Sequence, residues 1–392
     1  MLIRTLILSA TFALPVSAQV QQGRPNVPEF SPAFDNQTRA PEMSDSVHYD
    51  VEIIADGLDH PWGVAVIGSG RYLVTERSGA MLIVEDGGGA KTPITGVPTV
   101  RAERQGGLLD VTIAADFEAS GRIFFTYAKP MRGGMSSTAA ATAILDQDTA
   151  RLTDVEDIFV QTPPSRSPLH YGSRIVLKGD HAYITLGERS TPEERVLAQD
   201  LGTTYGKVVR IALDGDAPSD NPLTDQPDAL AEIYTYGHRN PQGAALHPET
   251  GELWTLEHGP KGGDELNRIV AGSNYGWPLT SYGENYNNSP VGTGITSADG
   301  ITEPRYYWDP VIAPSDFVFY EGDTFDWNGQ IIAGSLRPGG IVRLKLDGDR
   351  VIGEARDLDQ LGRVRDVELD QNGELLLLID ANNGELLRIT PG

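Results

Sequence analysis

The stretch His60–Val84 reads HPWGVAVIGSGRYLVTERSGAMLIV, and the unit it contains decides the fold class. It opens on a Pro and Gly turn, continues with an apolar run, turns again at Gly68–Gly70 and enters a second apolar run. Both runs are rich in Val, Ile and Leu, are bounded by turn residues and are too short for typical helices. The stretch therefore predicts two strands joined by a tight turn.

The same unit recurs five more times along the chain. The later copies begin at Gln105 (QGGLLDVTI), His170 (HYGSRIVL), Asn240 (NPQGAAL), Pro314 (PSDFVFY) and Arg363 (RVRDVELD). Successive starts lie 45, 65, 70, 74 and 49 residues apart, at or above the ~40–50 residues of a propeller blade, with the surplus in Gly-, Pro- and Asn-rich insertions. We predict an all-β fold, a six-bladed β-propeller with four-stranded antiparallel blades over residues 48–392. A β-sandwich array would not repeat one unit six times.

Shorter signals agree with this prediction. The sequences LDGD at Leu213–Asp216 and Leu346–Asp349, and NNG at Asn382–Gly384, are typical of hairpin turns. The run Glu374–Ile379 suits a central strand, and only Pro192–Gln199 has a helical composition. Strands therefore dominate the expected structure.

The N-terminus has the features of an export signal. Arg4 precedes an apolar run that ends in the small residues Val16-Ser17-Ala18, so we expect residues 1–18 to be a signal peptide cleaved near Ala18. Residues 19–47, rich in Pro, Gln, Asn and Ser, are expected to form an exposed N-terminal segment. No later stretch reaches the ~20 apolar residues of a membrane span. These features predict a periplasmic or secreted protein without a membrane anchor.

Composition excludes several classes of function. The chain has no cysteine, so it has neither disulfides nor thiolate chemistry. Its formal net charge of −24 argues against binding of nucleic acid, which requires Lys and Arg to neutralise phosphates. An acidic protein that binds an anionic small molecule must gather its few cations in one place. We therefore expect a local cluster of arginines.

The openings of the repeats are the candidate site, because the loops at one end of a propeller converge on its channel. His170 precedes small residues and is the natural general base, although a structural histidine bonded to a neighbouring blade is an equal alternative. Arg239 and Asn240 lie in the turn GHRNPQG, where the arginine could instead tie blades together. Both readings place these side chains at the channel mouth.

Three further arginines form a candidate anion site. Arg363 and Arg365 are two residues apart, so on a strand both side chains face the same way and could clamp a carboxylate. Arg337 has similar glycine-rich surroundings in GSLRPGG, and could equally be a solvated loop residue.

The segment Glu257–Tyr286, EHGPKGGDELNRIVAGSNYGWPLTSYGENY, is a candidate cation site. Its Gly and Pro residues favour a fixed loop that turns carbonyls toward a hard cation, and Asp264 and Glu265 offer carboxylates. Calcium suits such ligands better than zinc or copper. An ordinary acidic turn is the alternative.

Together these motifs resemble a known family. QGGLLDVTI, HYGSRIVL, GHRNPQGAALHPETGELWTLEHGPKGGDELN, NYGWPLTSYGENY and GRVRDVELD, in this order, resemble the soluble quinoprotein aldose sugar dehydrogenases of the glucose/sorbosone dehydrogenase family. The resemblance covers residues 48–391. It implies a six-bladed propeller with pyrroloquinoline quinone (PQQ) and Ca²⁺ at the channel mouth, and oxidation of aldose sugars at C1 to the lactone.

The resemblance also implies roles for individual residues. His170 would accept the proton of the sugar's anomeric hydroxyl, and Arg239 would polarise the quinone carbonyl. The residues implied to bind the cofactor are Gln105, Arg239, Asn240, Tyr286, Arg337, Arg363 and Arg365. Those implied to bind calcium are Gly259, Pro260, Glu265 and Tyr275.

Two positions depart from the glucose dehydrogenase branch. Arg337 stands where that branch carries lysine, and Leu169 stands where it carries an aspartate before the catalytic histidine. Both departures weaken an assignment to glucose in particular and leave aldose oxidation as the expectation. The sequence leaves open the preferred sugar, the external electron acceptor and the choice between monomer and homodimer.

Two other functions remain as alternatives. A calcium-dependent lactonase on a similar propeller would need several carboxylates around its metal and would leave the arginines unexplained. A non-catalytic propeller that binds a sugar or a protein would be expected to lack the pair His170 and Arg239, and this chain has both.

Overall fold

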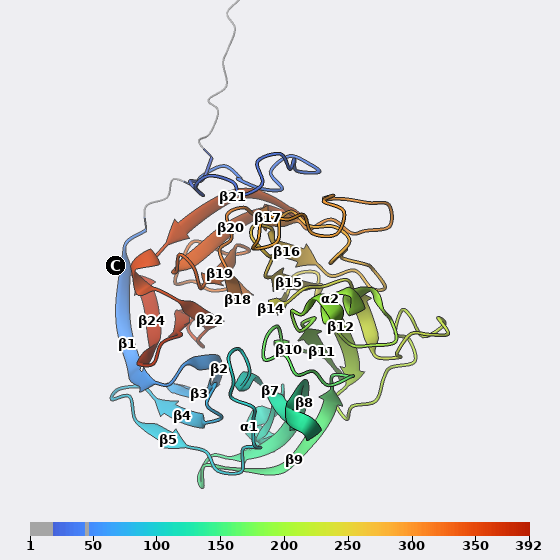
Figure 1. Ribbon diagram of the computed structural model, residues 1–392. Helices are drawn as coiled ribbons and strands as arrows, with labels where there is room; N and C mark the ends of the chain where they lie inside the picture. Colours follow the sequence, from blue (N-terminus) through green and yellow to red (C-terminus); the bar gives the residue numbers. More distant parts are fainter. Residues whose placement is uncertain (1–18, 44–46) are drawn as a thin grey trace, which may run out of the picture.

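The computed structural model describes residues 19–43 and 47–392, and in it the chain closes into a ring of six antiparallel sheets (Figure 1). Each sheet has four strands, so the predicted six-bladed propeller is confirmed. The predicted signal peptide, residues 1–18, lies outside the described residues. Within the described part, none of the helices is long and apolar enough to cross a membrane.

The first three blades follow the chain in order, each from its inner to its outer strand. Blade 1 consists of β2 (Pro61–Gly68), β3 (Arg71–Glu76), β4 (Met81–Glu85) and β5 (Lys91–Pro93). Blade 2 consists of β6 (Leu108–Ile113), β7 (Arg122–Met131), β8 (Met135–Asp146) and β9 (Arg151–Val160). Blade 3 consists of β10 (Gly172–Lys178), β11 (His181–Leu186), β12 (Lys207–Ala212) and β13 (Ile233–Tyr236).

The other three blades complete the ring. Blade 4 consists of β14 (Pro241–Leu246), β15 (Leu253–Glu257), β16 (Asp264–Arg268) and β17 (Tyr306–Trp308). Blade 5 consists of β18 (Pro314–Phe319), β19 (Ile331–Ser335), β20 (Ile341–Asp347) and β21 (Arg350–Asp357). Blade 6 joins both ends of the chain, because β22 (Val364–Leu369), β23 (Leu375–Ile379) and β24 (Gly384–Pro391) are completed by β1 (Tyr49–Leu58). The β1–β24 pairing thus closes the ring.

Helices are few and short. The helical composition of residues 192–199 is confirmed by α2 (Pro192–Arg195) and the 3₁₀ turn η2 (Val196–Gln199). Thr191 caps α2, since its side chain accepts a hydrogen bond from the Glu194 amide. The structure adds α1 (Phe117–Ser120) and two further 3₁₀ turns, η1 (Arg132–Gly134) and η3 (Asp359–Leu361).

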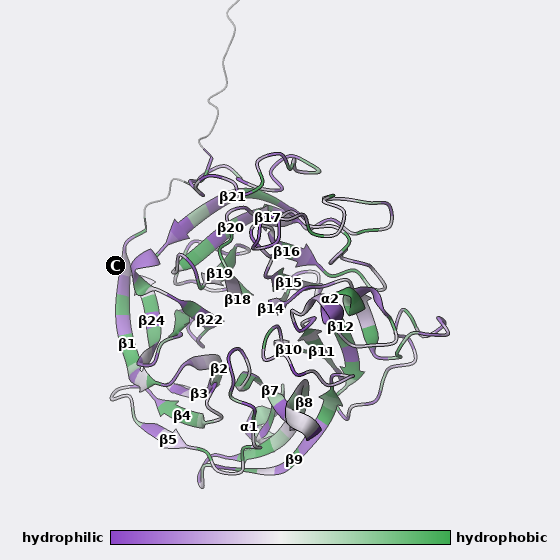
Figure 2. Ribbon diagram, in the orientation of Figure 1, coloured by the Kyte–Doolittle hydropathy of each residue, from purple (hydrophilic) through white to green (hydrophobic). Residues whose placement is uncertain are grey.

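The hydrophobic core lies between blades. Six clusters of buried apolar side chains each join two adjacent blades. The cluster that contains Leu58, Val74 and Leu378 joins blade 6 to blade 1. Green, apolar stretches run along β4 and β20, whereas the outer strands β1 and β21 carry purple, polar stretches (Figure 2). The packing therefore fixes the blades against one another and holds their loops in place at the channel.

The N-terminal segment differs from the expectation of an exposed lead-in. Much of residues 19–43 is exposed, but five side chains are buried against blades 4 and 5, namely Val20, Gln22, Val27, Gln37 and Ala40. The amides of Asn26 and Val27 each donate to the Asp309 carboxylate at 2.9 Å. The segment is docked because it covers polar groups and apolar surface at the outer strands.

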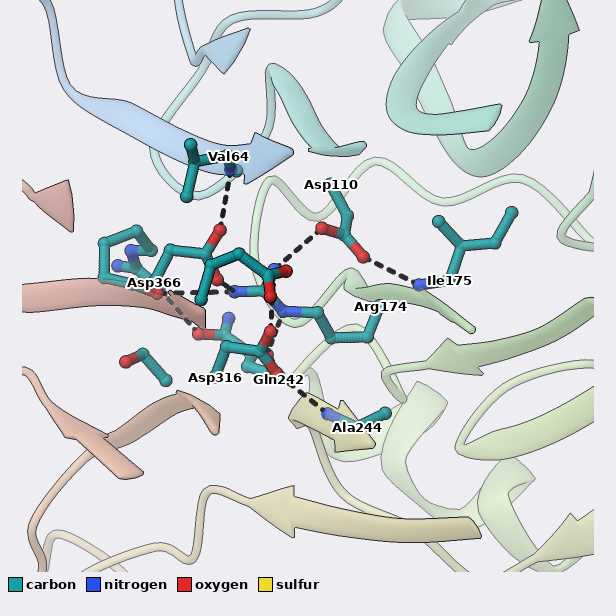
Figure 3. A network of polar contacts seen from close by, with 12 residues as sticks. Val64, Asp110, Arg174, Ile175, Gln242, Ala244, Asp316 and Asp366 are labelled. Atoms are coloured by element: carbon teal, nitrogen blue, oxygen red, sulfur yellow. Dashed lines mark hydrogen bonds and ion pairs between the residues drawn. The ribbon is translucent and has the colours of Figure 1, made fainter. Parts of the chain in front are cut away.

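At the centre of the ring, the innermost strands meet in a buried ionic cluster (Figure 3). The Arg174 guanidinium on β10 lies 2.7 Å from Asp110, 3.4 Å from Asp316 and 2.8 Å from Asp366. The three carboxylates come from β6, β18 and β22. One arginine thus links four of the six blades beneath the channel mouth.

Candidate active site

The candidate site is a cavity of about 230 Å³ at the channel mouth, where the predicted repeat openings meet. Its lining residues are Trp62, Arg77, Gln105, Gln242, His258, Ala313, Leu336, Arg363 and Arg365. Three of them, Gln105, Arg363 and Arg365, were predicted as site residues. In an acidic protein this concentration of arginines confirms the expected local cluster.

His170 is buried beside this cavity and is paired with Glu188. Its Nδ1 lies 3.0 Å from the Glu188 carboxylate, so Nδ1 carries the proton and Nε2 keeps a free lone pair. Burial lowers the pKa of His170; Glu188 opposes this shift and Arg239 adds to it. Burial alone would raise the pKa of Glu188, but His170 and Arg239 bring it below its usual range. The pair is a neutral imidazole held by a carboxylate, which is the state a general base requires.

The backbone around His170 is fixed by two predicted residues from other blades. The Gln105 side-chain oxygen accepts a hydrogen bond from the His170 amide at 2.7 Å. The Asn240 side-chain oxygen accepts one from the Gly172 amide at 3.0 Å. Gly187 is required here because a Cβ at that position would lie 2.1 Å from the His170 carbonyl oxygen. The contacts bring His170, Gln105 and Asn240 into one assembly.

Arg239 lies in the same assembly and is held by its surroundings. Its amide donates to the Glu257 carboxylate, and one guanidinium nitrogen donates to the His258 carbonyl at 2.9 Å. The guanidinium also lies 5.2 Å from the centre of the Trp277 ring. Its Nε is buried and has no hydrogen-bond partner among the described residues. Arg239 therefore keeps an unused donor beside His170.

Arg363 and Arg365 face the same way, as predicted, and share one acid. Asp380 accepts from Arg363 at 2.8 Å and from Arg365 at 3.3 Å, and lies 2.7 Å from Nδ1 of His60. Burial raises the pKa of Asp380, but these three partners lower it overall. Burial lowers the pKa of Arg365 to about 10 in spite of Asp380. The single carboxylate of Asp380 therefore neutralises only part of the positive charge of Arg363 and Arg365.

His258 and Gln242 lie between Arg239 and the arginine pair Arg363 and Arg365. Nε2 of His258 lies 3.1 Å from the Gln242 side-chain oxygen, which also accepts from Arg365 at 2.9 Å. Burial, Arg365 and Arg239 hold the pKa of His258 well below its usual range. His258 is thus neutral and adds no charge to the cavity.

The loop Gly259–Pro260 suits a hard cation. The Gly259 amide donates to Asp264 at 2.7 Å, which fixes the loop. Within residues 19–43 and 47–392, no hydrogen bond to the carbonyl of Gly259 or Pro260 is present, and both residues are buried. Carbonyl oxygens without donors are the ligands that Ca²⁺ takes.

The other two predicted calcium ligands lie behind Arg239. Glu265 faces Glu257 across β15 and β16, and burial together with Glu257 holds its pKa well above the usual range. The Tyr275 hydroxyl donates to the Arg268 carbonyl at 2.6 Å, and its ring stacks on His238 at 4.6 Å. Only the main-chain carbonyl of Tyr275 is therefore free to coordinate.

Two predicted site residues lie away from the cavity. Tyr286 is 76 % exposed, and Arg337 is exposed on the loop after β19. Neither is among the residues that line the cavity. His170, Arg239 and Asn240 do not line it either, but hydrogen bonds join them to the lining residues Gln105 and His258. No such contact among the described residues joins the side chain of Tyr286 or Arg337 to this group.

Sequence reasoning missed the acids that hold the site, although the repeats contain a signal for them. Glu188, Glu257 and Asp380 all stand where the second strand of a repeat ends. In an antiparallel hairpin this end lies beside the opening of the first strand, as in the pairing of Pro241 with Glu257. An acid at this position predicts a partner at the opening of the same blade.

Comparisons with known proteins agree with this geometry. The family model of Glucose / Sorbosone dehydrogenase matches residues 58–388. The chain belongs to this family. It is 39% identical to the aldose sugar dehydrogenase YliI of Escherichia coli over 348 residues, which cover 87% of this chain and 93% of that relative.

Solved structures of family members share the fold. The soluble aldose sugar dehydrogenase from Escherichia coli in its apo form superposes with a TM-score of 0.84 and 38% identity, covering 88% of this chain and 100% of that one. The PQQ-bound aldose sugar dehydrogenase from Streptomyces coelicolor has a TM-score of 0.72 and 25% identity, covering 88% and 99%. These relatives are dehydrogenases, so the expected family and the oxidoreductase class are confirmed.

Proposed function

We propose that this family member is a PQQ-dependent aldose dehydrogenase, which oxidises the sugar at C1 to the lactone and passes the electrons to an external acceptor. The observation that carries the proposal is the neutral His170, held by Glu188, next to an Arg239 with an unused donor at an arginine-lined cavity. Base, positive charge and anion site are the three elements that such a reaction needs.

The residues present fit PQQ. The cofactor carries three carboxylates, and the Nε atoms of Arg239 and Arg365 are buried without a partner in the described part of the chain. Arg363 and Arg365 would bind the carboxylates, and Gln105 and Asn240 would border the ring system. Arg337 and Tyr286 would reach the cofactor from their exposed loops outside the cavity. When bound, the quinone supplies a two-electron acceptor for the hydride of the sugar's C1.

The chain's own residues supply acid–base and electrostatic catalysis. Nε2 of His170 takes the proton of the anomeric hydroxyl, and Glu188 stabilises the imidazolium that forms. The Arg239 guanidinium places a fixed positive charge where negative charge grows during hydride transfer. Because Arg239 is already held by Glu257 and His258, little reorganisation is required.

Calcium is part of the proposal. The carbonyls of Gly259 and Pro260 would hold the ion that contacts the cofactor, and Glu265 with the Tyr275 carbonyl would hold a second ion. Within residues 19–43 and 47–392, no group of three or more His, Asp or Glu side chains could hold a metal. A calcium-dependent lactonase needs such a group, so the redox function is favoured.

The proposed location follows from the N-terminus. We expect the chain to be exported and processed near Ala18, which would place the enzyme in the periplasm or outside the cell. Peptide sequencing of the mature N-terminus would test this, with Gln19 as the expected first residue.

One experiment tests the function. Purified apoprotein is supplied with PQQ and Ca²⁺, and reduction of a dye is followed with a panel of aldoses. We expect sugar-dependent reduction only with both additions, and no recovery if a chelator precedes them. Full sugar oxidation with NAD and no quinone would overturn the proposal, while sugar binding without dye reduction would favour a non-catalytic propeller.

A further inference from the structure

Five arginines gather on the channel-mouth face over the first three blades, to one side of the cavity. They are Arg77, Arg101, Arg104, Arg132 and Arg166, which we name the arginine rim. They stand in loops that end at this face, namely the β3–β4 turn, the loop before β6, the turn η1 between β7 and β8, and the loop before β10. Residues distant in sequence thus share one surface.

Hydrogen bonds from arginine side chains to main-chain carbonyls connect the loops of the arginine rim. Arg77 donates to the Arg104 carbonyl at 2.9 Å. Arg101 donates to the Gly134 carbonyl at 2.8 Å and to the Arg166 carbonyl at 3.4 Å. A carbonyl satisfies the guanidinium nitrogen without neutralising its charge, so these contacts hold the arginines together in spite of their repulsion.

Few carboxylates balance these charges. The ion pair of Arg101 with Glu103, at 2.7 Å, is the only one that the arginine rim makes among the described residues. Arg104, Arg132 and Arg166 are exposed and have no carboxylate partner in that part of the chain. The whole chain has a net charge of −24, so this positive surface contrasts with the rest of the molecule.

The arginine rim borders the candidate site. Arg77 lines the cavity, and Arg104 directly precedes Gln105, whose side chain accepts from the His170 amide at 2.7 Å. A protein docked on the rim therefore lies over the mouth through which electrons must leave.

We propose that the arginine rim docks an acidic electron-accepting protein, an inference that rests on the proposed sugar oxidation. Each oxidised sugar gives up two electrons and two protons, so two one-electron acceptors are reduced per turnover and the protons pass to solvent. Repulsion by the acidic faces and attraction by the rim together orient such a partner toward the site.

The test uses one redox protein in two charge states. The probes are a basic cytochrome c and the same cytochrome with its lysines succinylated, which makes it acidic. Binding to the cofactor-free full-length protein is measured at low and at physiological salt, and reduction by the reconstituted enzyme is followed with sugar. We expect the acidic cytochrome to bind and be reduced faster, with the preference weakening as salt rises.

Matched variants locate the surface. Arg104→Glu with Arg166→Glu reverses two exposed charges on the arginine rim and leaves Arg77 in place, because Arg77 lines the cavity. The control, Arg122→Glu with Arg151→Glu, makes the same charge change at the opposite end of blade 2, where both residues are exposed. We expect the rim variant to weaken binding and slow reduction of the acidic cytochrome about 10-fold or more, and the control to change them less than about 2-fold.

The outcomes separate the docking surface from the function. Equal effects of the two double variants, or binding of the acidic cytochrome that ignores the rim variant, would overturn the docking proposal. Sugar-dependent reduction of a small uncharged dye should be the same in wild type and rim variant. If the wild type reduces no dye while acidic-cytochrome binding still depends on the rim, the proposed oxidation fails and the docking surface stands for another purpose.

Discussion

At the residue scale, the site depends on which of two buried histidines, His170 or His258, can accept a proton. His170 and His258 are both buried near Arg239, and burial lowers the pKa of each. Of these two histidines, only His170 has a carboxylate on its Nδ1, because Glu188 stands just beyond the end of the second strand of the same repeat. That contact fixes the tautomer and lets one imidazole, not the other, act as a base.

The first prediction separates a catalytic from a structural His170. His170→Gln should keep the fold and much of the PQQ affinity, because glutamine retains polarity and approximate size but cannot accept the proton usefully. Turnover should fall ~10²–10⁴-fold, the usual contribution of a general base. Melting temperature, PQQ titration and single-turnover cofactor reduction decide the matter. Near-normal reduction with a lower melting temperature would assign the residue a structural role.

The second prediction concerns Glu188 and pH. The Glu188 carboxylate raises the pKa of His170 against the effect of burial, so Glu188→Gln should lower that pKa further. The base form of His170 is the active one, so the acid limb of the rate profile should move to lower pH while the plateau rate falls. A profile of kcat against pH for wild type and variant measures both effects. An acid limb that stays in place would remove Glu188 from the acid–base chemistry.

The third prediction concerns Arg363. This side chain is half exposed and its proposed contact is with a carboxylate remote from the reacting carbonyl. Arg363→Ala should therefore weaken PQQ affinity more than it slows the saturated enzyme, since a contact made equally in ground and transition states changes binding without changing turnover. PQQ titration beside saturated turnover tests this, and normal affinity with slow turnover would contradict it.

Part of the site could be predicted from the sequence, and the limit is physical. Polar residues at repeat openings such as His170 and Arg239 stand out because their position follows from the repeat itself. Asp380 does not stand out, because its role depends on Arg363, Arg365 and His60 meeting at one point in space. Tyr286 was matched by motif alone, and a motif does not determine whether an exposed loop folds over the cavity.

At the element scale, local pattern predicted strands well and long-range pairing poorly. The runs at β2 and β23 are apolar over their whole length, so the local sequence alone predicts that both faces of these strands are buried. The strand β1 belongs to no repeat copy and alternates weakly, and it forms because β24 offers an open edge more than 300 residues away. The four-residue α1 is too short to give a periodic signal.

The N-terminal segment is the second element that the sequence did not place. Its polar composition suggested full exposure, yet Gln22 donates to the buried Glu354 of β21 at 2.8 Å, and the Ala40 amide donates to the Tyr306 hydroxyl of β17 at 2.9 Å. It covers the outer strands of blades 4 and 5, which are sheet edges (Figure 1). Covered edges are protected from pairing with other chains.

The fourth prediction follows from this contact. A chain that starts at Val47 loses the hydrogen bonds from Gln22 to Glu354 and from the Ala40 amide to Tyr306, each worth about 0.5–1.5 kcal/mol. Tyr306 still donates to Glu354, so the further loss comes from the apolar surface that the segment no longer covers. We expect the melting temperature to fall by at least ~3 °C. Hydrogen exchange should accelerate in β17 and β21 and stay unchanged in blades 1 and 2, the internal control. Unaltered exchange at β17 and β21 would show that the segment does not stabilise these edges.

At the scale of the whole molecule, four of the six blades contribute buried charges to the centre of the ring, and these charges do not balance. Arg174 faces Asp110, Asp316 and Asp366, and burial raises the pKa of each of these carboxyls in spite of the arginine. Glu368 lies near the same cluster, and burial raises its pKa to about 7. The ring therefore favours protonated carboxyls at its centre, which makes its stability depend on pH.

The last prediction uses Asp110, whose pKa burial raises to about 6 against the opposing effect of Arg174. An unfolded aspartate titrates near ~3.9, so the folded chain binds more protons between pH ~4 and ~6. The stability gained is fully present below that window and is lost as pH rises through it. Asp110→Asn cannot titrate, and it also lowers the pKa of Asp316 by removing a neighbouring charge.

The unfolding free energy of the wild type should decrease as the pH rises through this window. In Asp110→Asn this decrease should be smaller by about 1–3 kcal/mol. Denaturant unfolding of wild type, Asp110→Asn and the control Asp148→Asn, on an exposed turn of the same blade, measures the slope of unfolding free energy against pH. The control should retain the wild-type slope, because its carboxyl stays in water. If Asp110→Asn also retains it, the protons taken up on folding reside elsewhere, and Glu368 becomes the next carboxyl to replace.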